Sequence, residues 1–138
     1  QNVTNLIAKE KKTGLDSKEA YICFTDSVNK IRKDLIALLN KLKSEGKKVV
    51  AYGATSKSTT ILNYCNINDK HINYICDTTA EKIGKYTPGT HIPIVSVKYF
   101  RKQIPDYTFL FAWNHKREIF KKEKKLLKKT KWIAHIKI

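Results

Sequence analysis

Short, almost uninterrupted apolar runs alternate along this chain with stretches whose apolar residues recur at helical spacing. The runs lie at residues 48–52, 71–76, 94–95, 106–112 and 131–136. Strands that are apolar on both sides are typical of a sheet covered on both faces, and helices between parallel strands supply the crossovers. We therefore predict an α/β fold of the Rossmann-like type, with a mostly parallel five-stranded sheet and flanking helices.

A helical arm precedes the first run. Asn2–Lys12 carries the apolar side of a short helix, and Gly14 interrupts the pattern. Asp16 with Glu19 three residues later is typical of a new helix start, because the two side chains can cap each other's backbone. This segment therefore predicts a helix, a break and a second helical start.

A long helix is expected from about Asp26, because apolar residues recur along one stripe until Gly46, which suits a helix end. Later helices are expected at residues 58–65, 97–102 and 115–131. We predict that residues 1–46 form the arm and the first long helix, and that residues 47–138 form the Rossmann-like domain. The whole chain is treated as one domain.

The size and cysteine content narrow the class of protein. The chain has 138 residues, which is enough for one domain with an ordinary core. Three cysteines without a C-x-x-C pair argue against a disulfide framework or a zinc ribbon. No apolar run approaches the ~20 residues that span a bilayer, and the first residues do not show a signal-peptide pattern. We predict a reduced cytoplasmic domain, and the start at Gln1 without any methionine indicates a piece of a longer protein.

The net charge is the feature that most invites a functional interpretation. Lys and Arg total 28 against 12 Asp and Glu, giving +16, and such a balance favours polyanions. Residues 115–131 alone carry nine Lys or Arg and two Glu, with apolar residues at helical spacing opposite the lysines. We favour an amphipathic helix with a solvated lysine face, so nucleic acid is not an expected partner. The alternative is a polyanion or nucleic-acid binding module that uses this lysine-rich helix.

Ligands of such sheets bind beyond the carboxyl ends of the strands, where the strand order reverses. If the first strand lies between the second and the fourth, three loops converge there. The loop from Gly53 presents helix-start amides, hydroxyls and Lys57, a combination that suits an anion such as a diphosphate. It has one glycine where the dinucleotide fingerprint has three, and no second glycine precedes Lys57 as in a Walker loop. A plain strand-to-helix turn explains it equally well.

The remaining polar candidates each have an ordinary structural explanation. Asp77 lies 24 residues after Gly53, near the place of a ribose-binding acid, but it is also typical of a strand-end turn. The loop 84–93 is either a binding loop or a surface excursion. His91 and His115 have no carboxylate or nucleophile spaced to form a catalytic set. Trp113 either covers a ring or packs, and the cysteines and histidines do not fall at metal-ligand spacings.

Several stretches occur together in one order. They are Val50–Lys57, Leu62–Cys65, Asp77, Gly84–Ile94, Pro105–Tyr107 and Ala112–Asn114. In this order and spacing they resemble the C-terminal domain of S-adenosylmethionine-dependent sugar C-methyltransferases, enzymes that act on nucleotide-linked deoxysugars. Leu6–Leu15 is similar to the segment that joins this domain to the methyl-transfer domain, so the resemblance covers essentially the whole chain.

The resemblance implies one part of a larger enzyme of deoxysugar biosynthesis. The family's complete enzymes also have a small zinc-binding domain and a central methyltransferase domain. S-adenosylmethionine and zinc are therefore expected in those missing domains, and no cofactor is expected on this chain. For this chain the resemblance implies binding of a nucleotide-diphosphate sugar without catalysis of its own. The absent methyltransferase domain is the other expected partner, and no membrane is.

One set of substrate-binding candidates results from the residues and the resemblance together. The set is Gly53, Ala54, Ser56, Lys57, Asp77, Tyr86, Thr90, His91, Trp113 and Asn114. The family's proposed catalytic Tyr and His residues belong to the central domain, so none is transferred to this chain. Many relatives have smaller residues than Ser56, Ser58 and Thr59, which is a departure at the expected phosphate contacts.

Overall fold

The computed structural model describes residues 2–136 and divides into two compact units, the first ending at Asp34 and the second beginning at Leu35. In the first unit, helix α1 spans Asn2–Lys12 as predicted, and all its residues are exposed. Helix α2, Lys18–Ser44, begins in the first unit and continues into the second. No helix in residues 2–136 is both long and apolar enough to cross a membrane.

The segment between α1 and α2 ends one helix and caps the next. Gly14 has a φ of +71°, a conformation that glycine adopts at little cost, so the predicted break is confirmed. The Oγ of Ser17 accepts a hydrogen bond at 3.1 Å from the amide three residues later. Asp16 is therefore wrong as the capping residue, because the next hydroxyl takes that role. The expected start near Asp26 is also wrong, since α2 begins at Lys18.

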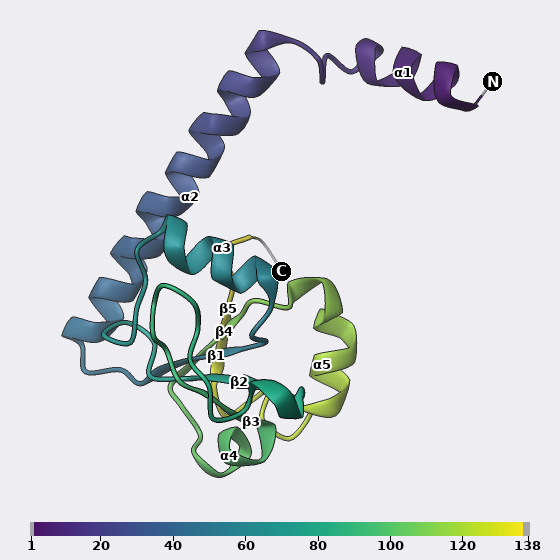
Figure 1. Ribbon diagram of the computed structural model, residues 1–138. Coiled ribbons are helices and arrows are strands. Elements are labelled where there is room, and N and C mark those ends of the chain that lie inside the picture. The colour runs from purple at the N-terminus through teal and green to yellow at the C-terminus, as the bar shows by residue number, and fades with distance from the viewer. Residues whose placement is uncertain (1, 137–138) are drawn as a thin grey trace. The chain divides into compact units, whose positions relative to one another are not determined.

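Five parallel strands form the sheet of the second unit, in the order β3-β2-β1-β4-β5. They are β1 (Val49–Tyr52), β2 (Ile75–Asp77), β3 (Ile94–Ser96), β4 (Tyr107–Leu110) and β5 (Lys131–Ile133). Ala51 in the central strand β1 pairs with Ile75 on one side and with Phe109 on the other. The predicted α/β fold with a parallel five-stranded sheet is confirmed (Figure 1).

Helices cover both faces of this sheet because successive residues of each strand point to opposite sides. The later helices are α3 (Ser56–Tyr64), α4 (Val97–Lys102) and α5 (Lys116–Lys122). Val49 and Ala51 face a core covered by α2 and α3, which contribute Leu35, Leu39, Leu42 and Leu62. Val50 and Tyr52 face a second core covered by α4 and α5, which contribute Val97, Phe100 and Ile119. The sheet is thus the middle of three layers.

Several expected strands are shorter than their apolar runs. The expected fifth strand, residues 131–136, is a strand only at Lys131–Ile133. The run 71–76 forms a strand only at Ile75–Asp77, because the amides of His71 and Ile72 donate to the Asn68 carbonyl in a turn. β4 likewise covers only Tyr107–Leu110 of the run 106–112. Hydrophobicity marks burial here, whereas the ladder of hydrogen bonds sets the strand length.

The lysine-rich helix expected at residues 115–131 is wrong in length. A short 3₁₀ turn at Trp113–His115 leads into α5, which ends at Lys122, and a chain of turns follows. Glu123 is buried at the end of α5, although its neighbours are lysines. Like charges four residues apart disfavour further helix. The turns instead bury Leu126 in the second core. The apolar residues of this segment therefore pack against the core as expected, although the helix is not continuous.

Candidate functional site

The sheet reverses its strand order between β1 and β4, and the loops after these strands meet there. The Phe111 amide donates to the Tyr52 carbonyl at 3.1 Å, which keeps the two segments paired just beyond β1 and β4. The Gly53 amide donates to the Cys76 carbonyl at 2.8 Å and ties the same point to β2. The ends of three strands therefore open onto one side of the sheet, called the carboxyl edge below. Ligands of open α/β sheets bind at such reversal points.

The one glycine of the first loop is required by packing inside the protein. Gly53 has a φ of +94°, and a Cβ at this position would lie 2.8 Å from the Cβ of Ala112. The Cβ atoms of folded proteins essentially never have a contact this short, and residues with a side chain rarely adopt this φ. The glycine thus lets the loops after β1 and β4 come together, before any ligand is considered.

Asp77 organises the loop after β1. Its Oδ2 accepts a hydrogen bond from the Ala54 amide at 2.7 Å, and its Oδ1 accepts one from the Thr79 amide at 2.8 Å. The Nζ of Lys82 lies 3.7 Å from Asp77 Oδ2 and donates to the Ala54 carbonyl at 2.7 Å. Burial raises the pKa of Asp77, but the hydrogen bonds from Thr79 and Ala54 and the charge of Lys82 outweigh it, so the pKa is lowered. Asp77 is therefore an anion that fixes the loop.

Helix α3 begins at the carboxyl edge with a reciprocal cap. The Ser58 amide donates to Thr55 Oγ1 at 3.2 Å, and the Thr55 amide donates to Ser58 Oγ at 2.9 Å. The first amides of a helix have no partner within it. Those of Ser56 and Lys57 also have no acceptor elsewhere among residues 2–136. These two donors remain available to an anion.

One hollow of about 280 Å³, here the Asp77 hollow, lies at the carboxyl edge beside α5. Its lining includes Tyr52, Gly53, Asp77, Lys82, His115 and Glu118. The Nζ of Lys122 donates to Glu118 at 2.7 Å, and the Nδ1 of His115 lies 3.9 Å from the same carboxylate. The hydrogen bond and charge of Lys122 lower the pKa of Glu118. The acids and bases that line this hollow are thus paired with one another. Such a lining favours a ligand with uncharged polar groups, such as hydroxyls.

An ion pair with a buried carboxylate is linked to the Asp77 hollow through Tyr52, which lines it. Arg101 of α4 donates through Nε and Nη2 to the two oxygens of Glu123, at 2.9 and 2.7 Å. The hydroxyl of Tyr52 donates to Glu123 Oε1 at 3.1 Å, and Glu123 is only 2% exposed. Burial and the Glu123 carboxylate raise the pKa of Tyr52, so its hydroxyl keeps its proton. The network joins α4, the end of β1 and the end of α5.

A second hollow of about 300 Å³, here the Tyr86 hollow, lies between the start of α3 and the loop 84–93. Its polar lining includes Thr55, Ser56, Thr59, Lys82, Lys85 and Tyr86. No carboxylate lines it in the described part of the chain. Two lysines, several hydroxyls and the nearby free amides therefore favour an anionic group.

The loop 84–93 is held in place by its own hydroxyls and by α3. Thr87 Oγ1 lies 2.7 Å from Thr90 Oγ1 and accepts the Ile92 amide at 2.9 Å. The Nδ2 of Asn63 in α3 donates to the Pro88 carbonyl at 3.0 Å. This loop is thus ordered against the helix whose N-terminus borders the Tyr86 hollow.

The structure brings half of the predicted site residues to these hollows. Gly53 and Asp77 line the Asp77 hollow. Ala54, Ser56 and Tyr86 line the Tyr86 hollow. The predicted neighbourhood of the loop after β1, the end of β2 and the loop 84–93 therefore exists as one edge of the sheet.

The other predicted residues lie near this edge without lining either hollow. Lys57 is exposed on the first turn of α3, and Asn114 is exposed after β4. Thr90 is buried inside its loop, while His91 is exposed with a φ of +53°. Trp113 is half-buried and packs on the second core. Their roles in binding stay predictions.

The predicted set omits several lining residues, among them Lys82, and also Thr55 and Lys85, which lie in loops that the sequence singled out. Lys82 could not be identified from the sequence because its hydrogen bond joins it to Ala54, which is distant in the sequence, and its ion pair with Asp77 depends on the fold. The only signal available was its position in a short turn directly after a strand-end aspartate. No group of three or more His, Cys, Asp or Glu that could hold a metal ion occurs within residues 2–136.

Comparison with known proteins extends over nearly the whole chain. Residues 1–136 match the family described as the C-methyltransferase C-terminal domain. The chain is also 34% identical over 125 residues to the C-methyltransferase NovU of Streptomyces niveus. That match covers 91% of this chain and 30% of the relative, so the chain spans less than a third of the relative's length.

Proposed function

The chain belongs to the family of C-methyltransferase C-terminal domains, and from this premise we propose that it binds the nucleotide-diphosphate part of a sugar substrate. The domain supplies position and binding energy to an S-adenosylmethionine-dependent C-methyltransferase and contributes no catalytic group. Binding a remote part of a substrate can hold the reacting carbon in place for transfer. The observation that carries the proposal is the Tyr86 hollow, where cations, hydroxyls and free amides gather without an acid.

The two hollows suit the two halves of such a ligand. In the proposal, the diphosphate contacts the amides of Ser56 and Lys57 and the ammonium groups of Lys82 and Lys85. The Asp77 hollow, with its paired charges, takes sugar hydroxyls. Lys82 lines both hollows, so it stands where phosphate and sugar would join.

The residues of this edge do not fit the methyl donor that the family implies. Adenosine-containing cofactors on such sheets use a glycine-rich turn and a carboxylate left free for the ribose. Here the space beside Gly53 is taken by Ala112, and both oxygens of Asp77 already accept backbone amides. We therefore propose that S-adenosylmethionine binds outside this chain.

An NMR titration with thymidine diphosphate and uridine diphosphate tests the proposal. The largest amide shifts are expected at Ser56, Lys57, Lys85 and Tyr86. Lys85→Gln removes one cation that has no ion pair among the described residues, so affinity should fall about fivefold, or ~1 kcal/mol.

The matched control is Lys43→Gln, which removes the same charge from the exposed surface of α2. Its affinity should stay within about twofold of the unmodified chain, since a distant surface charge is screened. Equal losses in both variants, or shifts that avoid the carboxyl edge, would contradict the proposed site.

A further inference from the structure

A larger hollow lies at the opposite end of the sheet, where the strands begin. It has a volume of about 760 Å³ and lies beside the starts of β4 and β5. Its lining includes Lys47, Tyr107, Phe120, Lys128, Lys131 and Trp132. We call it the lysine bowl and this side of the sheet the amino edge.

The cations of the lysine bowl have no acidic partners. Lys47, Lys128, Lys129 and Lys131 line it, and none forms an ion pair with a carboxylate of residues 2–136. The single acid in the lining, Asp106, accepts the Lys48 amide at 2.7 Å. At the carboxyl edge, by contrast, each acid of the Asp77 hollow faces a lysine. The bowl is therefore a concentrated source of positive potential.

Aromatic rings gather beside these lysines from three separate elements. Tyr107 comes from β4, Phe120 from α5 and Trp132 from β5, and all three are half-buried. The Phe120 and Trp132 rings lie 5.0 Å apart between centroids, and the Nζ of Lys131 lies 5.6 Å from the Tyr107 ring centre. The Trp132 Nε1–H is buried without a hydrogen-bond partner among the described residues. An unpartnered buried donor is costly and calls for an explanation.

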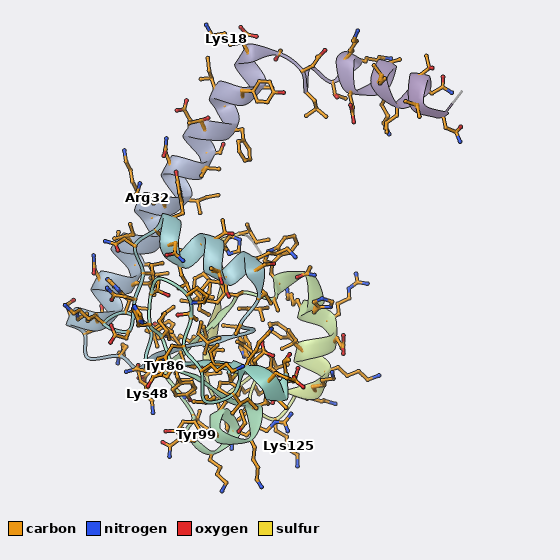
Figure 2. All side chains as sticks on the ribbon, in the orientation of Figure 1. Lys18, Arg32, Lys48, Tyr86, Tyr99 and Lys125 are labelled. Atoms are coloured by element: carbon orange, nitrogen blue, oxygen red, sulfur yellow. The ribbon has the colours of Figure 1, made fainter. Side chains whose placement is uncertain are left out.

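The positive surface continues past the bowl. A neighbouring hollow of about 590 Å³ shares Lys129 and is lined further by Lys121, Lys124 and Lys125. Its one acid, Glu123, is already held by Arg101. Figure 2 labels Lys125, which is exposed. Within residues 2–136, the lining of the two hollows therefore holds more cations than acids.

We propose that the lysine bowl binds a phosphate group carried on a planar base, that is, a nucleoside phosphate, either free or as a unit of a nucleic-acid strand. The unpaired lysines attract the phosphate, and the half-buried rings of Tyr107, Phe120 and Trp132 offer apolar surface against which a base packs. The volume lies within the range of small-molecule sites. This site is separate from the proposed sugar-nucleotide site, because the two occupy opposite ends of the strands.

NMR titration at low salt tests the bowl through the indole N–H signals of the 138-residue chain. The chain has two tryptophans, and Trp113→Phe assigns the signal of Trp132. Adenosine monophosphate is expected to move the Trp132 signal. Inorganic phosphate and adenosine should each bind at least fivefold more weakly than adenosine monophosphate. The first lacks the base and the second lacks the phosphate. Affinity should fall as salt rises.

A pair of variants separates the bowl from general charge. Lys128→Gln with Lys129→Gln should weaken adenosine monophosphate binding at least fivefold. Lys9→Gln with Lys11→Gln, on the exposed helix α1, removes the same charge and should change it less than twofold. Equal effects of the two pairs, or no movement of the Trp132 signal at millimolar ligand, would overturn the proposal.

Two further outcomes locate the ligand and its source. If Lys85→Gln abolishes adenosine monophosphate binding while the Lys128 and Lys129 pair does not, the nucleotide sits at the carboxyl edge and the bowl proposal is overturned. An adenylate oligomer of about ten units is the other probe. Tighter binding than the monophosphate by more than about tenfold assigns the bowl to a strand, and similar binding assigns it to a free nucleotide.

Discussion

The two ends of the sheet differ in how their charged side chains are paired. At the carboxyl edge, Asp77 is held by two backbone amides and by Lys82, and Glu118 is held by Lys122. At the amino edge, the lysines of the bowl form no ion pair with a carboxylate of residues 2–136, and Lys131 lies over the Tyr107 ring. The acids of the first arrangement are paired within the protein, whereas the second leaves its cations to solvent or to a ligand.

This contrast shows what a net charge of +16 does and does not indicate. The excess lysines do not form the proposed substrate site, which rests on a helix start, hydroxyls and two lysines. Eight lysines line the lysine bowl and its neighbouring hollow, and others lie on α1 and α2. The whole-chain charge therefore does not locate the proposed substrate site.

The largest difference between the edges is expected from glycine substitutions. Gly53→Ala forces a Cβ to 2.8 Å from Ala112 at a φ of +94°, and should cost about 3 kcal/mol of unfolding free energy. Gly46→Ala near the amino edge has a φ of +66° and nothing within 4 Å, so about 1 kcal/mol is expected. Urea unfolding measures both. Equal losses would mean that the carboxyl edge is not the tightly packed one.

The two aspartates at the edges give the next comparison. Asp77→Asn weakens the acceptor of two amides at a buried position and should cost about 2 kcal/mol. Asp106→Asn affects one amide at an exposed position, so about 0.5 kcal/mol is expected. Chemical denaturation of both variants at pH 7 checks the difference. A larger loss at Asp106 would reverse our view of which edge is preorganised.

Lowering the pH tests whether the charge of Asp77 stabilises the carboxyl edge. The pKa of Asp77 is lowered from 3.8 in the folded protein, so its stabilisation is present above that value and lost as pH falls through the folded pKa. The stability gap between the unmodified chain and Asp77→Asn should therefore narrow below about pH 4. Unfolding curves from pH 6 to pH 3 measure it. A gap that stays constant with pH would show that the Asp77 charge does not stabilise the fold.

The smallest effect is expected from removing charge in the lysine bowl. Lys128→Gln with Lys129→Gln relieves repulsion among unpaired cations and should raise stability by about 0.3 kcal/mol at low salt, with the gain lost at high salt. Thermal unfolding at two salt concentrations checks it. A clear loss of stability would mean that these lysines have partners within the fold.

Much of the fold followed from the sequence because its signals were strong and local. The apolar runs, and Gly14 and Gly46 at the breaks, gave α1, the end of α2 and the five strands. The start of α2 was mispredicted because Ser17, and not Asp16, caps the helix. The lysine-rich helix was mispredicted because one contact of a buried acid overrides a repeating pattern. Glu123 turns inward to Arg101, so the expected helix 115–131 ends at Lys122.

The position of the candidate site could be predicted from the sequence, but several of its lining residues could not. Topology rules located the edge where Gly53 and Asp77 lie. Lys82 was missed because it reaches the site from a turn that no local pattern marks. Lys85 lies in the loop 84–93, which was a candidate binding loop, but the residue itself was not singled out. The aromatic rings of the lysine bowl could not be predicted either, since they come from three elements.

The amide exchange rates of Ser56 and Lys57, measured by NMR with and without a nucleoside diphosphate, test the central claim most directly. These two amides have no acceptor among the described residues, so a diphosphate bound at the start of α3 would become their acceptor. Our account predicts that both rates fall clearly at saturating ligand, while amides of α1 do not change. Unchanged rates at Ser56 and Lys57 under those conditions would contradict it.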